Sequence, residues 1–76
     1  MKKIGITGGS GFIGHQITSL LLEKNYKIKS CDLYKPKKIF LRNKNYKFKK
    51  INLFDKKKLE SFFSDVDCVI HLAASL

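Results

Sequence analysis

Residues 7–14, Thr-Gly-Gly-Ser-Gly-Phe-Ile-Gly, place glycines at a regular spacing and include no charged side chain. Gly8 would permit a tight turn, and Gly11 would let a ligand approach the main chain closely. Gly14 would let the first turn of a helix lie close to the preceding strand. Because free N–H groups and the helix dipole both favour an anion, such a turn predicts the binding of a pyrophosphate.

The segments on both sides of these glycines have the patterns of a strand and a helix. Residues 3–7 alternate apolar with small or polar side chains, as a short strand does. Residues 12–24 have apolar side chains at helical spacing, so the N–H groups of Phe12 and Ile13 would face the pyrophosphate. The predicted apolar stripe of this helix consists of Ile13, Ile17, Leu20 and Leu21.

Asp32 ends a second strand-like segment, residues 26–32, eighteen positions after Gly14. Dinucleotide-binding folds place an acidic residue ~20 positions after the glycine turn, at the tip of the second strand. There a carboxylate accepts hydrogen bonds from the ribose hydroxyls of adenosine and repels a 2′-phosphate. The position therefore favours NAD over NADP. Three lysines that follow would weaken this repulsion: Lys35, Lys37 and Lys38.

The rest of the chain continues to alternate strands with helices. Strands are predicted at residues 46–51 and 67–72, and a helix at about residues 55–63, whereas residues 33–45 leave the second crossover undefined. This alternation predicts an α/β fold, the first half of a Rossmann-type doubly wound parallel sheet with strand order 3-2-1-4. In that order the first and fourth strands are neighbours, and ligands bind beyond their carboxyl ends.

With these features the sequence resembles the extended short-chain dehydrogenases, the NAD-dependent epimerase/dehydratase family that includes UDP-glucose 4-epimerase. Residues 7–14 match the family's Thr-Gly-Gly-x-Gly-[Phe/Tyr]-Ile-Gly signature in full. Asn52-Leu53 stands where the family usually has Asp-Ile or Asp-Leu beside the adenine. Residues 69–74 resemble the family's fourth strand, which ends in His-x-Ala-[Ala/Gly]. The resemblance extends over residues 1–76.

The motif and the resemblance together imply an NAD cofactor and its contacts. The amide oxygen of Asn52 would still accept a hydrogen bond from the adenine amino group. The end of the fourth strand would lie near the second ribose of the cofactor, with His71 a strand residue rather than a catalyst. The predicted cofactor-binding residues are Gly8, Gly11, Phe12, Ile13, Gly14, Asp32, Asn52, Leu53, Leu72, Ala73 and Ala74.

The resemblance further implies that residues 1–76 are the N-terminal part of a single NAD(P)-binding Rossmann domain of a sugar-nucleotide epimerase, dehydratase or reductase. The family's catalytic Ser or Thr and its helical Tyr-x-x-x-Lys would follow Leu76, so no catalytic residue is predicted here. Residues 34–38 and 46–50 fit Tyr-x-x-x-Lys by letter, but neither lies in a predicted helix. A nucleotide-sugar substrate and a homodimer are expected only of the full-length protein. A nucleotide-binding module without chemistry, or a redox sensor, is the alternative.

The net charge of +10 raises the question of nucleic-acid binding. The lysines are spread along the chain and Arg42 is the one arginine, which makes a nucleic-acid binder the least favoured alternative. Cys31 and Cys68 are expected on the second and fourth strands, too far apart for a disulfide, as buried reduced thiols of a cytoplasmic protein. No spacing of Cys and His predicts a metal site, and no apolar run reaches the length of a membrane span.

Overall fold

The computed structural model describes residues 2–72 and contains one parallel sheet with the strand order β3-β2-β1-β4. This is the Rossmann-like α/β arrangement that the sequence predicts. The strands are β1 (Lys3–Thr7), β2 (Lys27–Asp32), β3 (Tyr46–Lys50) and β4 (Cys68–His71). The helices of the described residues are α1 (Phe12–Glu23), α2 (Lys38–Leu41) and α3 (Lys56–Phe62).

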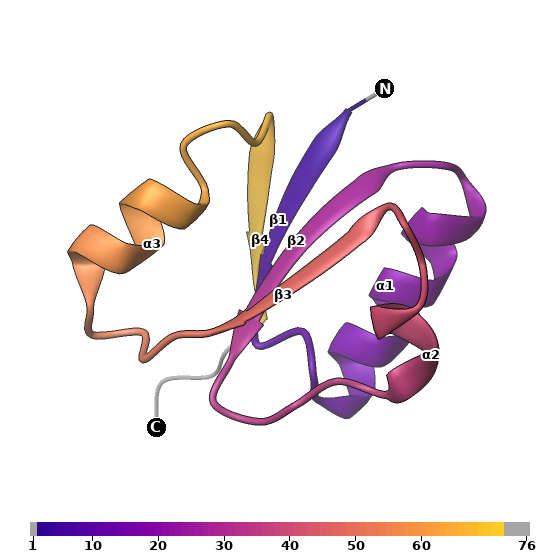
Figure 1. Ribbon diagram of the computed structural model, residues 1–76, viewed down its shortest axis with the longest axis horizontal. Helices are drawn as coiled ribbons and strands as arrows, with labels where there is room; N and C mark the ends of the chain where they lie inside the picture. The colour runs from indigo at the N-terminus through magenta and orange to yellow at the C-terminus, as the bar shows by residue number, and fades with distance from the viewer. Residues whose placement is uncertain (1, 73–76) are drawn as a thin grey trace.

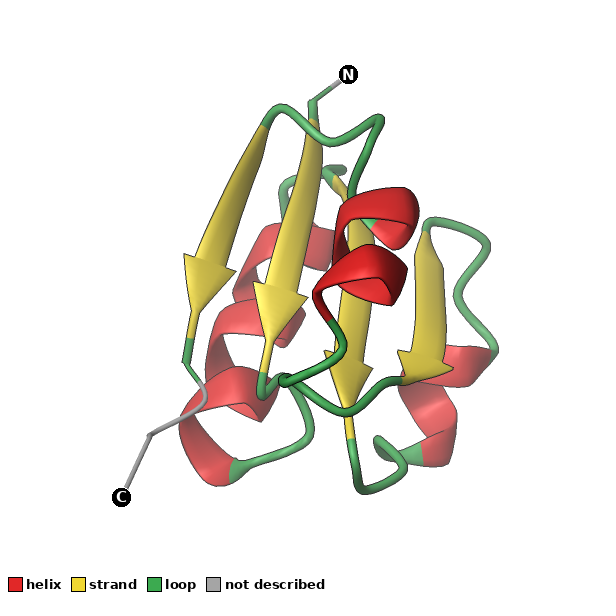
Figure 2. Ribbon diagram, turned by 90° about the vertical axis from the view of Figure 1, so that its left-hand side faces the viewer, coloured by secondary structure: helices red, strands yellow, loops and turns green. Residues whose placement is uncertain are grey.

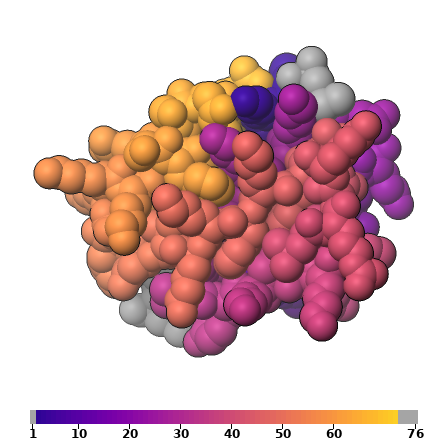
Figure 3. Space-filling view, in the orientation of Figure 1, coloured from indigo at the N-terminus to yellow at the C-terminus, as the bar shows by residue number. Residues whose placement is uncertain are grey.

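Helices cover both faces of the sheet. Figure 1 shows α1 and α2 on one side of the strands and α3 on the other. The space-filling view shows the same separation, with the atoms of α3 in orange at the left and those of β3 and α2 in red at the centre and right (Figure 3). All four strands point the same way, so their carboxyl ends meet at one edge, where the turn from β1 to α1 begins (Figure 2).

The main core lies between the sheet and the pair α1 and α2. Its buried side chains are Ile4, Ile6, Ile28, Phe40 and Tyr46. Helix α1 contributes Gly14 and Thr18, which are buried, and Ile17, Leu21 and Leu22, which pack at the margin of the core. The predicted stripe is therefore wrong at two positions, since Ile13 and Leu20 are 61% and 52% exposed. Gly14 lies directly against the main chain of Gly9, and this contact turns the Gly14–Thr18 side of the helix inward.

Helix α2 resolves the segment that the sequence left undefined. It is a single short helix, and its Phe40 enters the core. The Phe40 ring lies 4.9 Å from the His15 ring of α1 and 5.5 Å from the Tyr46 ring of β3, measured between centroids. This row of rings ties the second crossover to both neighbouring elements.

On the opposite face, a glycine lets α3 approach the sheet. A Cβ atom on Gly5 would lie 2.6 Å from the ring of Phe63, so any other residue would have to displace that ring from its place over β1. The register also brings lysines from three strands to this face, because paired residues of parallel strands share a face. These lysines are far apart in the sequence but are neighbours in the structure. They are Lys3, Lys27, Lys29, Lys47 and Lys49.

The two cysteines lie on β2 and β4 with β1 between them, as predicted, and both are free. Cys31 is fully buried, and its burial, with a smaller effect of the Asp32 carboxylate, raises the pKa of the thiol to about 11. It is therefore protonated and unreactive at neutral pH. The expectation that both thiols are buried is wrong for Cys68, which is exposed because β4 is the outer strand of this sheet. Within residues 2–72, every helix is too short or too polar to cross a membrane.

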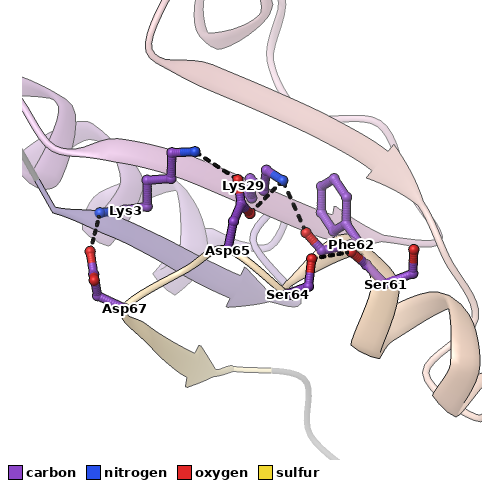
Figure 4. A network of polar contacts seen from close by, with 7 residues as sticks. All are labelled: Lys3, Lys29, Ser61, Phe62, Ser64, Asp65 and Asp67. Carbon is purple, nitrogen blue, oxygen red and sulfur yellow. Dashed lines mark hydrogen bonds and ion pairs between the residues drawn. The ribbon is translucent and has the colours of Figure 1, made fainter.

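Asp65, in the loop between α3 and β4, joins that loop to two strands (Figure 4). Its carboxylate accepts hydrogen bonds from Lys29 Nζ at 2.7 Å and from Lys3 Nζ at 2.6 Å. Lys29 also donates to the carbonyl oxygen of Phe62 at 3.1 Å, and the main-chain N–H of Lys3 donates to Asp67 at 2.8 Å. This network attaches the end of α3 to the sheet and partly neutralises the lysine-rich face.

We expect Asp65→Asn to lower the melting temperature at neutral pH, with an effect that shrinks in acid. The hydrogen bonds and charges of Lys29 and Lys3 hold the pKa of the Asp65 carboxyl well below its usual 3.8. A depressed pKa stabilises the fold above the unfolded-state value, and that contribution is lost as the pH falls through the folded-state value. Thermal unfolding from pH 7 to pH 2 checks this: the difference between wild type and variant should be constant above about pH 5 and shrink below about pH 4. A difference independent of pH would contradict it.

Candidate functional site: a glycine turn facing the acid of β2

The turn after β1 has the conformation that the glycine spacing predicts. Gly8 has a φ of 74°, in the left-handed region that glycine adopts without strain. Its N–H donates to the carbonyl oxygen of Cys31 at 2.9 Å, which holds the start of the turn against the end of β2. The predicted role of Gly8 as the residue of the tight turn is confirmed.

Two further glycines allow the turn and the helix to pack together. A Cβ on Gly14 would lie 2.6 Å from main-chain atoms of Gly9, so Gly14 packs against the turn itself. The sequence predicts a close approach of Gly14 to the strand instead, and this prediction is wrong. A Cβ on Gly9 would collide with the hydroxyl of Ser30 on β2. Gly9 is not among the predicted site residues, although the spacing Gly9-x-Gly11-x-x-Gly14 also fits the glycine pattern of dinucleotide-binding turns.

The start of α1 is open toward solvent. Gly11 is the N-cap residue, no side chain caps the helix, and no acidic residue lies in its first turn. The first main-chain hydrogen bond at this end runs from the N–H of His15 to the carbonyl oxygen of Gly11, at 2.8 Å. The N–H groups of residues 12–14 thus have no acceptor within the helix. The side chains of Phe12 and Ile13 are exposed, so a ligand at this end would meet their main chain.

Asp32 directly contacts the glycine turn. Its Oδ2 accepts a hydrogen bond from the N–H of Ser10 at 3.1 Å. Its Oδ1 accepts from the N–H groups of Leu33 at 2.7 Å and Tyr34 at 3.3 Å. These bonds fix the carboxylate beside the open end of α1 and leave Oδ2 a lone pair for a further donor. Ser10 and Asp32 are twenty-two residues apart in the sequence, and the bond between them joins the turn and the acid in one site.

A cavity of about 150 Å³ adjoins this carboxylate. Four of the predicted site residues come together in its wall, with two apolar residues that no sequence pattern indicated, Leu33 and Phe54. The predicted residues among them are Gly8, Asp32, Asn52 and Leu53. Asn52 begins a turn, because its Oδ1 accepts a hydrogen bond from the N–H of Phe54 at 2.9 Å. The wall of the cavity thus contains one acid and is otherwise mostly apolar.

A second cavity, of about 290 Å³, has Ser10 and Gly11 of the turn in its wall. The loop after β2 supplies Pro36 and Lys37 to its wall, and α1 supplies His15. Of the three lysines that follow Asp32, Lys37 is the one that lines this cavity. No sequence motif marks Pro36 and Lys37, which directly precede the short helix α2.

The end of β4 reaches the same edge of the sheet. The N–H of Leu72 donates to the carbonyl oxygen of Thr7 at 2.9 Å, which places Leu72 beside the last residue of β1. His71 is a strand residue, as predicted, and its Nδ1 lies 3.1 Å from the hydroxyl of the buried Thr7. Ala73 and Ala74, the last two predicted contacts, lie outside the described residues. Residues 46–50, one of the Tyr-x-x-x-Lys matches, form β3 itself and not a catalytic helix.

Residues 4–76 match the model of the NAD dependent epimerase/dehydratase family. Among solved structures, dTDP-glucose 4,6-dehydratase of Bacillus anthracis in complex with NAD is 27% identical, with a TM-score of 0.84, over 99% of this chain and 27% of that chain. The enzyme WbmH of Bordetella bronchiseptica in complex with NAD⁺ is 34% identical, with a TM-score of 0.84, over 100% and 27%. The UDP-Glc/GlcNAc 4-epimerase of Campylobacter jejuni is 30% identical, with a TM-score of 0.80, over 100% and 25%. A search of curated proteins found no match.

The chain spans about a quarter of the length of these solved proteins. The family match covers almost all of it and includes the glycine turn, Asp32 and the end of β4. The chain therefore belongs to the NAD-dependent epimerase/dehydratase family.

Proposed function

We propose that this chain binds NAD at the carboxyl edge of its sheet. The pyrophosphate lies at the open start of α1, where the N–H groups of residues 12–14 and the helix dipole favour an anion. Gly11 leaves the approach open, since a Cβ there would have no neighbour closer than the Gly8 carbonyl oxygen at 3.8 Å. The adenosine ribose lies at Asp32, whose Oδ2 has a lone pair for a ribose hydroxyl.

The adenine then belongs in the cavity of about 150 Å³ beside Asp32. The base is flat and largely apolar on its faces, and this cavity offers Leu33, Leu53 and Phe54 as walls. The larger cavity beside Ser10 is the more polar of the two, because Lys37 and His15 lie in its wall together with apolar residues, and it suits a base less well. Leu72 continues the site past β1, toward the nicotinamide half of the cofactor.

We further propose that this chain is the N-terminal part of the cofactor domain of an enzyme that acts on a nucleotide sugar. The dehydratase and the epimerase named above support this class of substrate. When bound, NAD would accept and return a hydride at the sugar. The described residues of this chain would hold and orient the cofactor, and the groups that move the proton would come from outside them.

One observation carries the proposal: the hydrogen bond from the Ser10 N–H to the Asp32 carboxylate, which joins the phosphate-binding turn and the ribose-binding acid in one site. Isothermal titration calorimetry with NAD and NADP tests it on the purified protein. We expect NAD to bind and NADP to bind at least about tenfold more weakly, because a 2′-phosphate would meet the Asp32 charge. A protein with native circular dichroism that binds neither dinucleotide would refute it.

A further inference from the structure

A cavity of about 100 Å³ lies at the amino edge of the sheet, opposite the edge of the proposed cofactor site. Lys3 and Lys27, the first residues of β1 and β2, lie in its wall. Three more lysines, one asparagine and one isoleucine complete the wall, and the lysines are Lys29, Lys44 and Lys47. The cavity shares no residue with the two cavities beside the glycine turn.

The register of the sheet brings four of these lysines together in pairs. Lys3 lies opposite Lys27 across β1 and β2, and Lys29 lies opposite Lys47 across β2 and β3. Neighbouring strands are only ~4.8 Å apart, and like charges directly opposite each other destabilise a sheet. Both pairs meet at this cavity, so an anion bound there would reduce a repulsion within the protein.

The acidic residues nearby compensate only part of this charge. Asp65 accepts hydrogen bonds from Lys3 Nζ and Lys29 Nζ, at 2.6 and 2.7 Å (Figure 4). Asp67 accepts from the main-chain N–H of Lys3 and not from an ammonium group. For the other three lysines of the wall, residues 2–72 provide no carboxylate within 4.0 Å. The cavity thus has three ammonium groups that can bind an external anion.

We propose that this cavity binds a diphosphate group, at a site separate from the cofactor site. Cavities that hold whole drug-sized molecules begin at about 300 Å³, so this smaller one suits a compact group. Lysine binds phosphate as a point charge, whereas planar carboxylates favour the fork of arginine, which the wall lacks. A diphosphate carries more charge than a single phosphate and can therefore meet several ammonium groups at once.

The test measures the binding of inorganic pyrophosphate to the purified protein by calorimetry, in about 50 mM salt so that screening is weak. The variant Lys27→Gln with Lys47→Gln removes one lysine from each pair. Lys24→Gln with Lys38→Gln is the matched control, because it removes the same charge from exposed lysines outside the cavity. Gly11→Val, which blocks the start of α1, separates this cavity from the glycine turn.

We expect the Lys27→Gln, Lys47→Gln protein to bind pyrophosphate at least about tenfold more weakly than the wild type, because two charge-assisted hydrogen bonds are lost. The control and Gly11→Val should stay within about threefold of the wild type. Without ligand, the Lys27→Gln, Lys47→Gln protein should melt at the wild-type temperature or above it, since both like-charge pairs are gone. Weaker binding then reflects the site and not the fold.

ADP distinguishes the two sources of a diphosphate. Equal affinity for ADP and pyrophosphate would indicate an inorganic anion, and tighter binding of ADP a nucleotide; both support the site if the two lysine substitutions abolish binding. The proposal is overturned if pyrophosphate does not bind, or if the control loses as much affinity as the Lys27→Gln, Lys47→Gln protein. It is also overturned if a single-stranded oligonucleotide binds about tenfold tighter than pyrophosphate through the same lysines, which would make this face a nucleic-acid surface. Each of these outcomes leaves the proposed cofactor site standing.

Discussion

Replacing Gly11 with valine should reduce NAD affinity by about a hundredfold or more, the largest effect expected of any single substitution in this chain. A valine side chain would occupy the open space in front of the α1 N–H groups and exclude the pyrophosphate. Losing two hydrogen bonds to a charged group costs about 3 kcal/mol or more. The backbone of Gly11, with φ −78° and ψ 179°, is one that valine adopts, so the fold should persist. Calorimetry with NAD measures the loss.

Thermal unfolding distinguishes loss of the ligand site from loss of the fold. Gly11→Val should lower stability only slightly, by up to about 1 kcal/mol, since valine is a poorer N-cap residue than glycine. Gly14→Ala is the matched control, because its Cβ would overlap the main chain of Gly9. Overpacking of that kind costs typically about 1–3 kcal/mol, so Gly14→Ala should lose stability more than Gly11→Val. Unchanged NAD affinity in a folded Gly11→Val protein would show that the pyrophosphate does not lie at this turn.

Replacing Asp32 with serine should abolish the preference for NAD over NADP. The carboxylate would no longer repel a 2′-phosphate, and the Lys37 ammonium in the adjacent cavity would attract it. NAD affinity should fall by about 10- to 100-fold, because a charge-assisted hydrogen bond to the ribose and the bond to Ser10 are lost together. Calorimetric titration of both dinucleotides gives the ratio of their dissociation constants.

Two companion variants separate charge from geometry. Asp32→Asn keeps an oxygen for the N–H groups of Leu33 and Tyr34 and removes the charge, so it should relax the discrimination. Its Nδ2 would replace the acceptor of the Ser10 N–H, so NAD affinity should fall as well. Adding Lys37→Ala to Asp32→Ser should weaken NADP binding and leave NAD binding unaffected. An Asp32→Ser protein that still rejects NADP would show that this carboxylate is not the selector.

The sequence alone determined the fold class and the places of the glycine turn and of the acid that ends the second strand. The glycine spacing, the acid eighteen residues later and the alternating strands and helices are local patterns, and local patterns specify a parallel sheet with right-handed crossovers. The boundaries of β1 were predicted without error, and those of α1 to within one residue. The turn at Gly8 was also correct, because a positive φ is a property of a single residue and its type.

Only the tertiary structure decided which hydrogen bonds these residues make and which side chains lie together on one face of the sheet or helix. The rotation of α1 depends on the contact between Gly14 and Gly9, so the predicted stripe failed at Ile13 and Leu20. The bond from the Phe54 N–H to Asn52 Oδ1 forms a turn in the wall of the cavity beside Asp32 that no sequence pattern indicated. Lysines scattered along the chain became neighbours on one face through the register of three strands. The physical reason is the same in each case, because close packing and hydrogen bonding depend on the folded arrangement of the chain. No local sequence pattern indicates which partner bonds to a given atom or packs against a given face.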